Sequence, residues 1–163
     1  MTLHGRAAEL VQQLKLVPHP EGGFYRELFR SPSAVQPADK RPPRSGLTSI
    51  DFLLAAGQFS AWHRVLSDEA WHLLEGGPLR LWLAPPQLDR VDFVDLAPAN
   101  SHSAPRHVVP ADWWQAAEPL SDFAYVGATV GPGFDFADFS FGRDDVPLRE
   151  AVAQRAPELR RLF

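Results

Sequence analysis

The stretch 57–76, GQFSAWHRVLSDEAWHLLEG, sets one histidine and one glutamate between two glycines, at Gly57, His63, Glu69 and Gly76. Segments 60–66 and 70–75 within it are predicted as two successive strands. Because side chains alternate along a strand, His63 shares one face with Ala61 and Val65. Imidazole and carboxylate groups bind metal ions and transfer protons, so this pair of strands is the first candidate for a functional site.

Alternation with a period of two continues along most of the chain and predicts an all-β fold. Ile50, Phe52 and Leu54, for example, form one apolar face of a strand. The other predicted strands are 24–30, 79–83, 90–96, 106–109, 125–130 and 136–141. About nine short strands without helical pattern between them are typical of a sandwich or barrel.

Helical spacing is confined to the two ends of the sequence. Near the N-terminus it runs from Leu3 to Leu14, with Thr2 as a candidate N-cap. Near the C-terminus it includes Leu148 and Leu159, but Pro157 interrupts it. We therefore expect short N- and C-terminal helices, the second of them in two parts.

Length, composition and charge favour one ordinary globular domain over residues 1–163. The chain has 163 residues, of which 45% are hydrophobic and 22% charged, and its net charge is -4. Its 16 Lys and Arg residues are scattered, so we expect no nucleic acid or membrane surface as partner. No apolar run reaches the length of a signal peptide or a membrane span, and a cytoplasmic location is expected. The absence of cysteine excludes thiolate chemistry.

Several segments together resemble one family of small cupins. Stretch 57–76 is similar to the first cupin motif, G(X)5HXH(X)3–4E(X)6G, and three further segments match a subfamily known as a domain of unknown function: HPEGGFYRE (19–27), SDEAWH (67–72) and VGATVGPGFDFADF (126–139). The resemblance implies a double-stranded β-helix, the cupin jelly roll. It also implies a homodimer and a fold similar to that of the dTDP-sugar epimerases.

Two of the four positions that bind metal in the cupin pattern are changed in this chain. Val65 stands at the second histidine position, and Gln115 stands at the histidine position of the second motif, within VVPADWWQAAEP (108–119). First-row metals usually take at least three imidazole or carboxylate ligands. We therefore expect no required cofactor. The alternative is a divalent metal held by His63, Glu69, Gln115 and His72.

The function that these residues favour is binding and proton transfer on a small molecule. His63 is predicted as a general base that acts on a sugar- or nucleotide-derived substrate in an isomerase- or epimerase-like reaction, with Glu69 orienting it and Tyr25 as the acid. Further residues are expected to contact the ligand, namely Arg26, Trp71, Gln115 and Asp138. A metal-assisted cupin enzyme and a non-catalytic binding protein are the alternatives.

Overall fold

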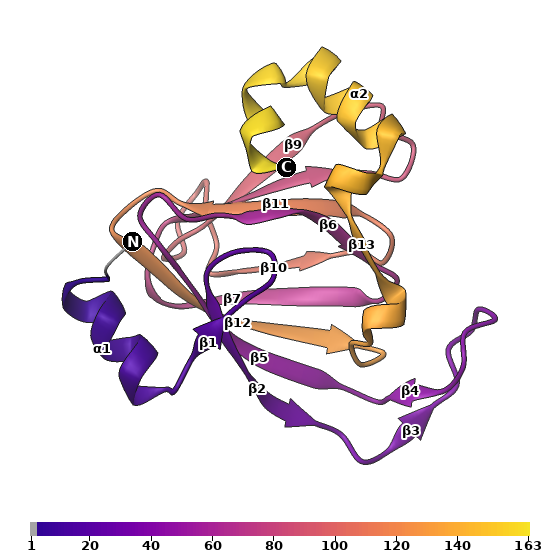
Figure 1. The fold of residues 1–163 in the computed structure, drawn as a ribbon, viewed down its shortest axis with the longest axis horizontal. Helices are drawn as coiled ribbons and strands as arrows, with labels where there is room; N and C mark the ends of the chain where they lie inside the picture. The colour runs from indigo at the N-terminus through magenta and orange to yellow at the C-terminus, as the bar shows by residue number, and fades with distance from the viewer. Residues whose placement is uncertain (1–2) are drawn as a thin grey trace.

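Residues 3–163, which the computed structural model describes, form two antiparallel sheets that pack face to face (Figure 1). The six-stranded sheet has the order β1 (Val17–Pro18), β2 (Phe24–Arg30), β5 (Thr48–Ala55), β12 (Phe123–Gly131), β7 (Asp68–Gly76) and β10 (Arg106–Val109). The five-stranded sheet has the order β13 (Phe139–Phe141), β6 (Ser60–Val65), β11 (Trp114–Pro119), β8 (Leu79–Ala84) and β9 (Asp92–Leu96). A short hairpin of β3 (Ala34–Val35) and β4 (Arg44–Ser45) projects from the sheets. The expected jelly roll is confirmed.

The main core lies between the two sheets. Phe52 and Trp71 from the larger sheet pack in one cluster with Leu81 and Ala117 from the smaller sheet. These residues occupy alternate positions on their strands, so each strand turns one apolar row toward the opposite sheet.

Helices cover the outer faces of both sheets (Figure 1). α1 (Gly5–Gln13) packs Leu10 against Leu53 of β5. α2 (Val146–Arg155) and the 3₁₀ helix η3 (Pro157–Leu162) pack on Trp62 and Trp114 of the smaller sheet. No helix within residues 3–163 is long and apolar enough to cross a membrane.

The helix predictions agree with the structure in type and in approximate position. The C-terminal helix is divided at Pro157, as expected. α1 begins at Gly5 and has His4 as its N-cap, whereas the proposed cap Thr2 lies outside the described residues.

One strand prediction needs correction, and one central strand was missed. The first half of segment 136–141 is a 3₁₀ helix, η1 (Phe136–Asp138), and only β13 is extended. β11 was not predicted, because WQAAEP is buried on both faces over its first four residues and so lacks a polar alternation. β11 nevertheless lies at the centre of the smaller sheet and carries Gln115.

Candidate active site

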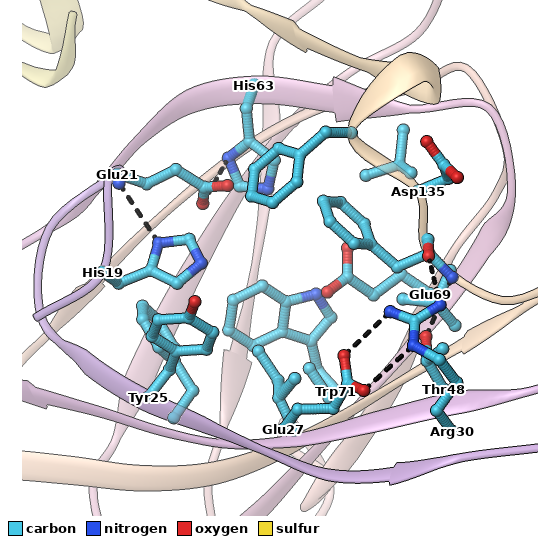
Figure 2. A pocket seen from close by; sticks show the side chains of 17 residues that line it. His19, Glu21, Tyr25, Glu27, Arg30, Thr48, His63, Glu69, Trp71 and Asp135 are labelled. Atoms are coloured by element: carbon cyan, nitrogen blue, oxygen red, sulfur yellow. Dashed lines mark hydrogen bonds and ion pairs between the residues drawn. The ribbon is translucent and has the colours of Figure 1, made fainter. Parts of the chain in front are cut away.

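A cavity of about 320 Å³ opens between the two sheets (Figure 2). Most of its wall comes from inward-facing, alternate residues of the larger sheet, and β6 and the loops at 19–21 and 134–136 complete it. The lining consists of His19, Glu21, Tyr25, Glu27, Arg30, Thr48, Ile50, Phe52, His63, Val65, Glu69, Trp71, Ala128, Val130, Phe134, Asp135 and Phe136. The structure thus brings together His63, Glu69, Tyr25 and Trp71 from the residues predicted by sequence.

His63 is held in one orientation and one tautomer. Its Nδ1 lies 2.7 Å from the carbonyl oxygen of Ala61, which can only accept, so Nδ1 carries the hydrogen. Nδ1 also lies 3.2 Å from Oε2 of Glu21, and the ring stacks on Phe139 with centroids 5.5 Å apart. Burial lowers the pKa of His63, against the attraction of Glu69. The neutral ring therefore presents the lone pair of Nε2, and Figure 2 shows this nitrogen turned toward the cavity.

Glu21 is a buried acid that the sequence reasoning missed. Its Oε2 accepts a hydrogen bond of 2.9 Å from Ser60 Oγ, and burial raises the pKa of Glu21 to about 8. At neutral pH the carboxyl group is therefore mostly protonated. The signal available in the sequence was its place in HPEGGFYRE, directly before Gly22 and Gly23.

We expect Glu21→Gln to change how stability depends on pH. The folded protein holds a proton on Glu21 that the unfolded chain releases above the ordinary pKa of 4.5. The stabilisation from this proton is present below pH 4.5 and is lost as pH rises to about 8. The free energy of unfolding of the variant, relative to wild type, should therefore rise by roughly 2–4 kcal/mol between about pH 5 and 8.5.

Urea unfolding at several pH values measures this difference. Glu150→Gln, an exposed change on α2, is the matched control. Parallel pH profiles for Glu21→Gln and wild type would contradict a buried protonated Glu21.

Glu69 is tied to the smaller sheet through Gln115. Gln115 Nε2 donates to Glu69 Oε2, and Trp71 Nε1 donates to Gln115 Oε1 at 3.0 Å. Burial raises the pKa of Glu69, although nearby His63 opposes the rise. Gln115 was predicted to contact the ligand, but it is buried and lies outside the cavity lining. There it holds Glu69 and Trp71 in place through its two hydrogen bonds.

His19 and Tyr25 form the side of the cavity next to Glu21. The ring of His19 meets that of Tyr25 edge to face at 4.5 Å, and its Nδ1 accepts a hydrogen bond of 3.1 Å from the backbone amide of Glu21. Burial lowers the pKa of His19 to about 4, so the ring is neutral. His19 also begins the segment HPEGGFYRE but was not predicted as a site residue.

Arg26, Asp138 and His72 are predicted site residues that the structure places outside the cavity lining. Arg26 donates to Asp51 at 2.7 Å, because alternation along β2 turns it to the face opposite Tyr25. His72 follows Trp71 on β7 and faces away from the cavity for the same reason. Asp138 is buried in ion pairs with two arginines, and the mouth is lined instead by Asp135.

The metal site implied by the cupin pattern does not fit these side chains. Val65 fills one ligand position of the cavity wall, the amide of Gln115 is engaged by Glu69 and Trp71, and His72 faces away. Within residues 3–163, no group of three or more His, Cys, Asp or Glu side chains is arranged to hold a metal ion.

The jelly roll and its cavity define a small-molecule protein of the cupin type. The family described as "Cupin superfamily (DUF985)" matches residues 8–142, and the chain belongs to this family. A comparison with curated proteins gives no match.

Solved structures support the same assignment. Protein SO0799 from Shewanella oneidensis is 30% identical, with a TM-score of 0.80 over 98% of this chain and 95% of that one. A hypothetical protein from Leishmania major is 26% identical, with a TM-score of 0.81 over 97% and 96%. Oxalate decarboxylase from Bacillus subtilis, at 15% identity, has a TM-score of 0.57 over 90% of this chain and 36% of its own, and it shares the fold alone.

Proposed function

We propose that this cupin is an isomerase- or epimerase-like enzyme in which His63 Nε2 removes a proton from a carbon beside a carbonyl group. The observation that carries the proposal is the neutral His63, whose Nδ1–H is bound to Ala61 and whose free nitrogen faces the cavity. A base of this kind needs a free lone pair near neutral pH and a fixed orientation. The substrate is a small sugar- or nucleotide-derived carbonyl compound.

The cavity also holds groups that suit the charge formed in this step. When the C–H bond breaks, its electron pair moves toward the carbonyl and gives an enolate oxygen, while Nε2 gains the proton. The protonated carboxyl of Glu21 is a hydrogen-bond donor for such an oxygen. The carboxyl of Glu69 favours the imidazolium that forms on His63.

Return of a proton completes the reaction. If Tyr25 donates its hydroxyl proton to the opposite face of the same carbon, the product is an epimer. His63 then releases its proton and Tyr25 regains one through solvent, so the enzyme returns to its first state. If His63 instead returns the proton to the former carbonyl carbon, and the hydroxyl proton on the adjacent carbon moves to the enolate oxygen, the product is an aldose–ketose isomer. Tyr25 and His63 both line the cavity, so both side chains can reach a ligand bound there.

Solvent deuterium uptake tests this function. The protein is incubated in D₂O with a panel of keto and aldehydo sugars and sugar nucleotides, and deuterium at carbons beside the carbonyl is followed by NMR. We expect uptake that depends on the protein for at least one compound. Binding of panel members without any uptake would overturn the catalytic proposal and favour a binding protein.

A further inference from the structure

Carboxyl groups outnumber cationic groups around the cavity. The lining contains four carboxyl side chains, Glu21, Glu27, Glu69 and Asp135, and one guanidinium, Arg30. Within residues 3–163, no Lys, Arg or His nitrogen lies within 4.0 Å of the carboxylate of Glu69 or Asp135. Glu69 is buried, and none of its described hydrogen bonds uses Oε1. Among the described residues, Oε1 is not one of the fully buried side-chain atoms that lack a partner, so it is reached from the cavity and can accept from a ligand there.

Arg30 does not supply a positive charge that is free to pair with an anionic ligand. Its Nε and Nη2 donate to the two oxygens of Glu27 at 2.9 and 2.8 Å, and its Nη1 donates to the carbonyl of Phe134 at 3.0 Å. Figure 2 shows this pair at the edge of the cavity, turned toward each other. The pair is neutral as a unit, so a phosphate or carboxylate entering the cavity meets Glu69 and Asp135 without a free cation.

The remaining wall is largely apolar, and five of its side chains are aromatic. Tyr25, Phe52, Trp71, Phe134 and Phe136 line the cavity. Aromatic faces attract cationic nitrogen, most strongly where water is excluded. An aromatic wall combined with unpaired carboxylates is complementary to a small organic cation.

We infer that the ligand carries a cationic nitrogen, such as the ammonium group of an amino sugar, and that no phosphate enters the cavity. This inference rests on the proposed function, because it names the class of carbonyl substrate for the same site. A volume of about 320 Å³ limits the part that enters to a small molecule. The ammonium group lies near Glu69 and Asp135, and the reacting carbon lies near His63.

Three ligands that share one ring and differ in charge test the inference. They are benzylammonium, benzyl alcohol and benzoate, and their Kd values are measured by NMR titration at pH 7. Benzylammonium should bind about tenfold or more tightly than benzyl alcohol, and benzoate should bind least. Glucosamine, glucose and glucuronate give the same comparison on a sugar ring. The inference would be overturned if, in both series, the neutral or the anionic ligand bound as tightly as the cation or more tightly. It would also be overturned if neither cation bound at millimolar concentration.

Variants locate the source of the preference. Glu69→Gln should remove most of the difference between benzylammonium and benzyl alcohol. Asp135→Asn, an exposed change that keeps the hydrogen bond from Ala137, should reduce it if Glu69→Gln does not fold. Glu75→Gln is the matched control on the same strand, since Glu75 pairs with Arg6 outside the cavity. An unchanged preference in both cavity variants would contradict the assignment.

The three benzyl-type ligands carry no C–H bond beside a carbonyl group, so they bind without reacting and their result is independent of proton transfer. A cation preference without deuterium uptake would support the cationic ligand and contradict the proposed enzyme activity, so the protein would be a binding protein for amines. Deuterium uptake without a cation preference would support the enzyme activity and contradict the cationic substrate class.

Discussion

The substitution His63→Gln should slow deuterium uptake into the substrate by about 10²–10⁴-fold, the usual contribution of one general base. Glutamine is polar and similar in size to histidine. It has no lone pair basic enough to take a proton from carbon. The loss should therefore appear in kcat, while Kd for a bound ligand changes little.

His72→Gln is the matched control, because it makes the same substitution on β7 outside the cavity. It should keep the wild-type rate. Circular dichroism and unfolding of both variants verify that the fold is intact. Retention of deuterium uptake in a folded His63→Gln protein would show that another group is the base.

Alternation along single strands was enough to predict part of the site. The pleat turns every second residue to the same face, so His63 with Val65, and Glu69 with Trp71, could be placed together from spacing alone. Tyr25 and Arg26 were both predicted as site residues, but neighbouring residues of a strand face opposite sides, and only Tyr25 lines the cavity. The roles of these residues and the homodimer stay predictions.

The remaining residues depend on loops and long-range partners that spacing does not encode. Glu21 reaches His63 only because the chain turns at Gly22, which has φ of +113° and a backbone so close to the carbonyl of Phe59 that a Cβ would overlap it. Asp138 was predicted to contact the ligand, and the apolar spacing of segment 136–141 changes phase near it. The phase changes because η1 interrupts the strand, and distant arginines determine where Asp138 points.

Asp138→Asn should destabilise the fold more than any other exchange of a carboxylate for its amide outside the cavity. Asp138 accepts from Arg41 Nη1 at 2.8 Å, and from Arg44 Nε and Nη2 at 2.9 and 2.8 Å. Its side chain is 2% exposed, and those of Arg41 and Arg44 are 12% and 9% exposed. The two arginines hold the pKa of Asp138 below its usual range. An uncharged amide would leave two guanidinium groups with too little compensating charge, at a cost of roughly 3 kcal/mol.

The control for this prediction is Asp95→Asn. Asp95 also accepts two hydrogen bonds from one arginine, Arg80, but both side chains are 27% exposed. Water replaces most of that interaction, so the expected loss is below about 1 kcal/mol. Urea unfolding followed by tryptophan fluorescence measures both variants, and equal losses of stability would contradict the role of burial.

Because Arg41 and Arg44 join the β3–β4 hairpin to η1, Asp138→Asn should also release Phe134, Asp135 and Phe136 from the cavity mouth. Its ligand affinity should therefore fall even under conditions where the protein remains folded, whereas Asp95→Asn should bind as the wild type does.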